Sequence, residues 1–228
     1  SNPYNLHLTN AKGFPVMPRV QAVFTGDLIG SRDVPATAVD AAMDSLKNAA
    51  QSLENVHGFP ARFTRNRGDG WQALLPDPHL ALHAYLAFAA TLRAADTGLA
   101  TRIAIGLGPV DSPGTADLSD ASGAAFVTSG DLLETLDTET AAIAGHGVTD
   151  WQRGVIALAD WIVSGWTAQQ AEAVAVTLLD PTHTTNAERA RTLGISRQAF
   201  ESRLKGSGLS AFAHARHAFR SHDFEAPA

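Results

Sequence analysis

Hydrophobic and polar positions along the first 110 residues alternate between the period of a strand and the period of a helix. Asp69-Gly70 lies between two short extended runs, and this dipeptide favours a tight hairpin. The predicted elements are strand 19–26, helix 35–56, strands 61–67 and 71–75, a helix over 78–92 that begins with Pro78, and strand 101–107. Their order is therefore β-α-β-β-α-β.

This order predicts an α+β protein with a ferredoxin-like fold, in which two helices cover one face of an antiparallel sheet. Asp27 directly follows the first strand, and Asp69 lies in the central hairpin. These strands are neighbours in the middle of a ferredoxin-like sheet. We therefore expect the two carboxylates to converge at one edge of it.

From residue 149 onward the pattern is helical throughout. Predicted helices cover 151–164, 167–179, 186–193, 196–205 and 209–220. The segment 185–206 has the small residue Ala190, then Gly194 for a turn and Ser196 as the N-cap of the next helix, a spacing typical of a helix-turn-helix. The predicted organisation is an N-terminal extension (1–18), a ferredoxin-fold domain (19–148) and a small all-α domain (149–228).

Charge is distributed unevenly over the 228 residues. The whole chain carries −6, but residues 181–222 hold seven Lys and Arg against two Glu, which gives +5. Only this segment offers a favourable field for phosphates, so double-stranded DNA is the expected partner, with a solvated helical surface as the alternative. Cysteine is absent, which excludes disulfides and thiolate metal sites. No apolar run is long enough to span a membrane, and a cytoplasmic location is expected.

Two converging carboxylates repel each other unless a cation compensates them, and hard oxygen ligands favour Mg²⁺ carried in with a phosphate substrate. The residues after Asp27, which are Leu28, Ile29, Gly30 and Ser31, can present backbone N–H groups to a polyphosphate. An exposed turn with an aspartate N-cap is the alternative interpretation.

Three segments carry a resemblance to a known family. FTGDLIGS (24–31), RGDGWQALLPDP (67–78) and RIAIGLGPV (102–110) resemble the core motifs of class III nucleotidyl cyclases. They are more similar still to SatD-type proteins, which couple a cyclase-like domain to a C-terminal helix-turn-helix. Motif order and spacing agree over 19–136, and GAAFVTSGDLLETL (123–136) is similar to the segment after the fourth strand.

The resemblance implies that Asp27 and Asp69 are metal ligands and that the backbone of Leu28, Ile29, Gly30 and Ser31 contacts a triphosphate. It places Arg65 and Asp120 at the base-reading positions. It also implies a homodimer, because cyclase-like domains usually form their sites across dimers.

Two further cyclase groups, an asparagine and an arginine that steady the ribose and the transition-state phosphate, have no counterpart here. One alignment places Val127 and Asp131 at these positions, and the other places Thr128 and Leu132. Losing one such donor costs on the order of 10²–10³ in rate. Nucleotide binding without turnover is therefore expected, although Arg102, Arg65 or Arg67 could substitute.

The predicted function is a DNA-binding transcriptional regulator whose cyclase-like domain senses a nucleotide or mediates dimerisation. Arg197 and Gln198 start the recognition helix, where side chains meet base edges. Ser196 and Arg203 are expected to belong to the same DNA-binding surface. Arg189 and Lys205 are expected to contact phosphates. The alternative is a divergent Mg-dependent nucleotidyl cyclase or nucleotide hydrolase that uses Asp27 and Asp69 as metal ligands.

Two remaining patterns are interpreted as packing. Gly106 and Gly108 follow the last predicted strand without a third glycine, so they predict close backbone packing rather than a dinucleotide site. Trp151, Trp161 and Trp166 recur at helical spacing and are expected to be packing anchors.

Overall fold

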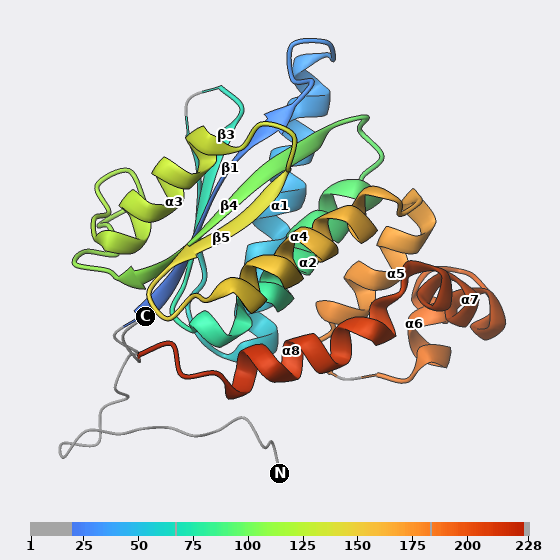
Figure 1. The fold of residues 1–228 in the computed structure, drawn as a ribbon. Helices are drawn as coiled ribbons and strands as arrows, with labels where there is room; N and C mark the ends of the chain where they lie inside the picture. The colour runs from blue at the N-terminus through green and yellow to red at the C-terminus, as the bar shows by residue number, and fades with distance from the viewer. Residues whose placement is uncertain (1–19, 67, 183, 226–228) are drawn as a thin grey trace.

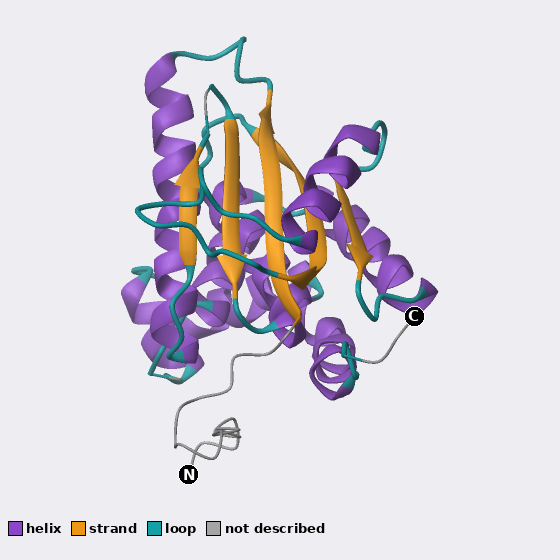
Figure 2. Ribbon diagram, turned by 90° about the vertical axis from the view of Figure 1, so that its left-hand side faces the viewer, coloured by secondary structure: helices purple, strands orange, loops and turns teal. Residues whose placement is uncertain are grey.

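Five strands form one mixed sheet in the order β2-β3-β1-β4-β5, seen face-on in Figure 2. The structure is a computed structural model that describes residues 20–66, 68–182 and 184–225. The predicted extension 1–18 and Arg67 lie outside the described residues. The strands are β1 (Val20–Ile29), β2 (Arg62–Arg65), β3 (Gly70–Leu75), β4 (Ala100–Pro109) and β5 (Ala141–Gly145).

Eight α-helices and two short 3₁₀ helices accompany the sheet in the described residues (Figure 1). They are α1 (Ala36–His57), η1 (Pro78–Leu80), α2 (Ala81–Ala94), α3 (Ala124–Thr135), α4 (Asp150–Ser164), α5 (Ala168–Leu178), α6 (Asn186–Thr192), α7 (Arg197–Ser207), η2 (Leu209–Ala211) and α8 (Phe212–Ser221). The α+β class is confirmed, and each element predicted from periodicity is present. α3 and β5 are additional.

The central strand β1 pairs antiparallel with both of its neighbours, and only β5 runs parallel to its partner β4. Alternate residues of β1 therefore face opposite sides of the sheet. Val20, Ala22 and Phe24 enter the main core with α1 and α2, whereas Val23 faces α3 and packs against Leu118 of the 111–122 loop.

Close packing of β4 against α3 explains the glycines of this strand. A Cβ at Gly106 would collide with the backbone of Ala125 and Ser129 in α3, and one at Gly108 would crowd Ala125. The prediction that these glycines serve packing is confirmed.

The C-terminal helices extend the main core. Residues of α4, α5 and α8 belong to the same buried cluster as the sheet and α2. Arg93, in the last turn of α2, donates to the carbonyls of Ser164 (2.6 Å) and Trp166 (2.5 Å) at the α4–α5 junction. On the neighbouring side, the Tyr85 hydroxyl donates to Asp160 of α4 (3.0 Å). The division of the chain after residue 148 stays a prediction, and the core crosses it.

A separate small cluster holds α6 and α7 against α5. Its buried members are Ala173, Ala190 and Phe200. After α8 the chain returns to the sheet, where Phe224 is buried and the carboxylate of Glu225 accepts from the backbone N–H of Val20 (2.9 Å). Among the described helices, none combines the length and the apolar character that crossing a bilayer requires.

His83 of α2 is buried where α1, α5 and α8 meet. Its Nε2 donates to the carbonyl of Leu178 (3.2 Å), so Nδ1 is the acceptor for a guanidinium nitrogen of Arg216 (3.4 Å). Desolvation, reinforced by the charges of His57, Arg216 and Arg220, holds the pKa of His83 well below its ordinary value. The neutral ring is therefore the form that this core accepts.

Acidification should destabilise the protein through His83. Below about pH 6.5 the unfolded chain takes up a proton that folded His83 refuses, so the free energy of unfolding falls by up to about 1.4 kcal/mol per pH unit. Chemical denaturation between pH 7.5 and 5.5 measures this fall. The free energy of unfolding of His83→Gln, which keeps a donor and an acceptor, should fall less over this range than that of the wild type. The control His214→Gln changes an exposed histidine and should lose as much stability as the wild type. Equal slopes for all three proteins would contradict the assignment.

Candidate functional site

Asp27 lies near the end of β1, beside Arg102 of β4. Both of its carboxylate oxygens accept from this arginine, Oδ1 from Nε (2.9 Å) and Oδ2 from Nη2. The third guanidinium nitrogen, Nη1, donates to the carbonyl of Leu136 (3.0 Å) at the end of α3. The hydrogen bonds with Asp27 raise the pKa of Arg102, and the charge of Asp69 adds to the rise. The arginine is thus the cation that compensates the two carboxylates.

The structure brings Asp69 to the same end of the sheet as Asp27. The backbone carbonyl of Asp69 accepts from the N–H of Leu28 (3.0 Å), and its side chain accepts from the hydroxyl of Ser31. Gly30 has a positive φ of 81° in the intervening turn. Because α1 begins only at Ala36, the four residues Leu28 to Ser31 do not form a helix N-terminus. Of the four backbone N–H groups expected to contact a phosphate, that of Leu28 is bonded within the chain instead.

Arg65 and Asp120, expected together as readers of a base, each bond to another residue, and Arg65 also lines a groove that the residues next to Asp120 share. Arg65 reaches Asp40 of α1 (2.7 Å) and the carbonyl of Gly68 (3.3 Å). Asp120 accepts from the backbone N–H (2.9 Å) and hydroxyl (2.7 Å) of Thr115 in its own loop. This loop packs on the α3 face of the sheet, whereas α1 packs on the opposite face. The two side chains therefore hold local structure.

An open groove of about 680 Å³ lies between the β2–β3 hairpin, the 111–122 loop and α3. Thr64, Gln72, Ser119 and Phe126 are among its lining residues. Gln72 donates to the hydroxyl of Thr25 (3.3 Å), which lies two residues before Asp27 on the same face of β1. The groove thus adjoins the Asp27 end of the sheet and offers polar and aromatic contacts to a small ligand.

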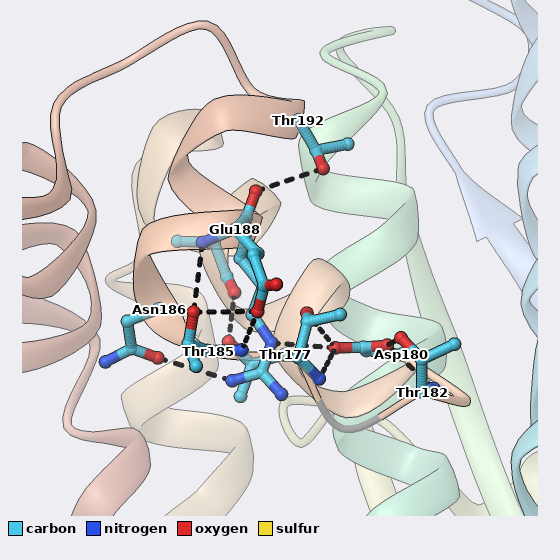
Figure 3. A network of polar contacts seen from close by, with 10 residues as sticks. Thr177, Asp180, Thr182, Thr185, Asn186, Glu188 and Thr192 are labelled. Carbon is cyan, nitrogen blue, oxygen red and sulfur yellow. Dashed lines mark hydrogen bonds and ion pairs between the residues drawn. The ribbon is translucent and has the colours of Figure 1, made fainter.

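The second candidate site is formed by α6, a tight turn and α7. α6 begins with a capping box in which Thr185 and Glu188 each bind the other's backbone N–H (3.3 and 2.7 Å; Figure 3). Gly194 takes a positive φ of 65° in the turn. Ser196 caps α7 by accepting from the N–H of Ala199 (3.1 Å), so its hydroxyl has a structural task.

Asp180 fixes this helix pair to the end of α5. It accepts from the N–H and hydroxyl of both Thr182 and Thr184, and from Nε of Arg189 (3.1 Å), as part of the network in Figure 3. Burial alone would raise the pKa of Asp180, but the hydrogen bonds from the two threonines outweigh it and hold the pKa well below its usual range. Asp180 is therefore charged at neutral pH and joins α5 to α6.

Two of the six residues predicted to bind DNA are mostly covered and paired with carboxylates of the preceding segment. The side chains of Arg189 and Asp180 are only 13% and 9% exposed, so Arg189 is used within the fold. Arg203 donates to Glu172 of α5 (2.7 Å) and is also mostly covered. Their placement differs from the expected solvent-facing contacts, because acidic residues of the preceding segment neutralise them.

The other predicted side chains lie on the outside of α7. Gln198 and Lys205 are exposed, and Arg197 is exposed while its Nε bonds to Glu201 (2.7 Å), one turn later. Sequence reasoning missed Arg191, which is exposed at the end of α6. In the described part of the chain, Arg191 and Lys205 make no ion pair.

The expectation that all three tryptophans are packing anchors is wrong for Trp161. Trp166 is a buried anchor whose indole donates to the carbonyl of Ser207 (2.7 Å), and Trp151 is partly packed against Phe219. Trp161 is 76% exposed, because it lies on the side of α4 that faces away from the sheet. It is not an anchor within this chain.

Asp180→Ala should lower the free energy of unfolding by about 3 kcal/mol or more, because it leaves the buried Arg189 without its carboxylate. Thermal or denaturant unfolding followed by circular dichroism measures the loss. Asp150→Ala removes a fully exposed partner of Arg153 and should change stability little. Equal effects of the two substitutions would show that Asp180 does not fix the helix pair.

Comparison with known proteins gives this chain no family. No protein-family model matches it, and no curated protein is similar to it.

Proposed function

We propose that the protein is a cytoplasmic DNA-binding regulator and that α6 and α7 form a helix-turn-helix. The observation that carries this proposal is the outer face of α7, which leaves Arg197, Gln198 and Lys205 exposed on a capped helix. α6 and α5 support this helix from behind through Phe200. A rigid helix with exposed polar and basic side chains suits the major groove of double-stranded DNA.

The side chains of α6 and α7 that we propose to contact DNA fall into two classes, those that read bases and those that bind phosphates. Gln198 lies in the first turn of α7, where an amide can read a base edge, with Arg197 beside it. Arg191 lies in the last turn of α6 and Lys205 in the last turn of α7, and neither forms an ion pair among the described residues, which suits phosphates. Arg189, held by Asp180, positions α6 instead of contacting DNA.

Lys205→Ala and Arg191→Ala should each weaken binding to mixed-sequence duplex DNA and reduce the slope of log affinity against log salt concentration by about one. Fluorescence anisotropy over a salt series measures both quantities. The matched control is Arg153→Ala, which removes an exposed arginine from α4. Failure of the wild type to retain duplex DNA at low salt, or equal weakening by the control, would refute the proposal.

The sheet supports a cyclase-like, ferredoxin-like unit as the second part of this regulator. Four strands follow the order β2-β3-β1-β4 with antiparallel pairing, and α1 and α2 share one face. The groove beside Gln72, which adjoins the Asp27 end of the sheet, is the feature that favours a nucleotide as its ligand. We propose that this unit binds a nucleotide without converting it to a product. The alternative is Mg-dependent cyclase or hydrolase chemistry.

We further propose that two copies pair through α4. Trp161 and Leu158 are 76% and 65% exposed, and Gly154 and Ala157 lie on the same outer face. Apart from its chain neighbours and the backbone of its own helix, none of the described residues lies within 4 Å of a Cβ built on Gly154. An antiparallel two-fold pairing would set Trp161 of each copy over Gly154 of the other and Leu158 over Ala157. It would also align the two helix dipoles favourably.

Trp161→Asp should convert this dimer to a monomer, because it places a charge at the centre of the apolar pairing. Sedimentation equilibrium measures the change. Val127→Asp alters the exposed apolar residue of α3 and should leave the dimer intact. A monomeric wild type, or a dimer that only the α3 substitution disrupts, would exclude pairing through α4.

A further inference from the structure

All three guanidinium nitrogens of Arg102 are committed within the chain. Two form a fork on the carboxylate of Asp27, and the third bonds to the carbonyl of Leu136. The backbone of Asp27 is fixed as well, because its carbonyl accepts from the hydroxyl of Thr101 (2.8 Å), which in turn accepts from the indole of Trp71 (3.0 Å). The position of Arg102 is therefore fixed by Leu136, and that of Asp27 is fixed by Thr101 and Trp71.

The donor set around Asp27 does not fit a divalent cation. Both oxygens of Asp27 face Arg102, and one oxygen of Asp69 is taken by Ser31. No cluster of three or more His, Cys, Asp or Glu suited to a metal occurs among the residues that the structure describes. Mg²⁺ requires near-octahedral oxygen ligands and gives up its water reluctantly, so it competes poorly with a preformed fork.

We infer that Arg102 is the resident cation of this site and that it excludes divalent metal from Asp27 and Asp69 in the free protein. Asp27 and Arg102 are only 27% and 33% exposed, so their attraction is screened less than that of a surface pair. An arginine suits this role because its charge is permanent and its planar fork matches a carboxylate. Arg102 is thus a specificity-determining residue that selects against free metal ions.

Removal of the arginine should open the site. In Arg102→Gln, two carboxylates at one end of the sheet lose their compensating charge, and Mn²⁺ can supply it. We expect Arg102→Gln to bind Mn²⁺ at least about tenfold more tightly than the wild type, measured by electron paramagnetic resonance of the free ion. Adding Asp27→Asn to Arg102→Gln should abolish the gain. Arg153→Gln, which breaks another arginine–aspartate pair, should behave as the wild type.

A second measurement uses the wild type alone and does not depend on how the variants fold. Mn²⁺ broadens the amide NMR signals of residues near its site, and the signals of Asp27 and Asp69 should not broaden more than those of acidic residues on the exposed surface. Preferential broadening at Asp27 and Asp69 would overturn the inference. So would a folded Arg102→Gln protein that gains no Mn²⁺ affinity, or a gain that survives Asp27→Asn.

This inference does not rest on DNA binding or on nucleotide binding. The DNA experiment involves α6 and α7, and a titration of the wild type with ATP tests the nucleotide proposal separately. Failure of either leaves the Mn²⁺ comparison between the wild type and Arg102→Gln unchanged.

Discussion

Helix α2 must be buried on both sides, and the arrangement of the chain follows from this constraint. Ten of its residues are buried, including Tyr85 and Phe88, so it cannot leave a face in water. One side packs on the sheet with Phe24 and Trp71, and α4, α5 and α8 cover the other. Hydrophobic burial of α2 thus joins the C-terminal helices to the sheet and provides a fixed support for α6 and α7.

Three arginines of the chain are used inside the fold. Arg102, Arg189 and Arg203 each bind a carboxylate that lies on another element or in the preceding loop. These pairs position β1 against β4 and the α6–α7 pair against α5. The positive charge that faces solvent on this pair is consequently smaller than the sequence total suggests, and it is concentrated at Arg191, Arg197 and Lys205. Their placement, and not the net charge, supports DNA binding.

Periodicity predicts the elements whose buried faces carry large apolar residues. It misses α3, whose only fully buried positions are Ala125 and Ser129, because glycines in β4 let small residues make the contact. It also misses β5, a strand of five residues rich in alanine. Ion pairs such as Arg102–Asp27, 75 residues apart, and Arg203–Glu172, 31 apart, depend on the tertiary fold and have no local signal. The candidate site residues could be chosen from the sequence, but their partners could not.

DNA recognition by the outer face of α7 is the central claim, and chemical-shift mapping tests it most directly. Titration of the ¹⁵N-labelled protein with duplex DNA should shift the amide signals of residues 191–205 first, led by those near Gln198 and Lys205. Shifts confined to the sheet or to α4, with the α7 signals unchanged, would contradict the account.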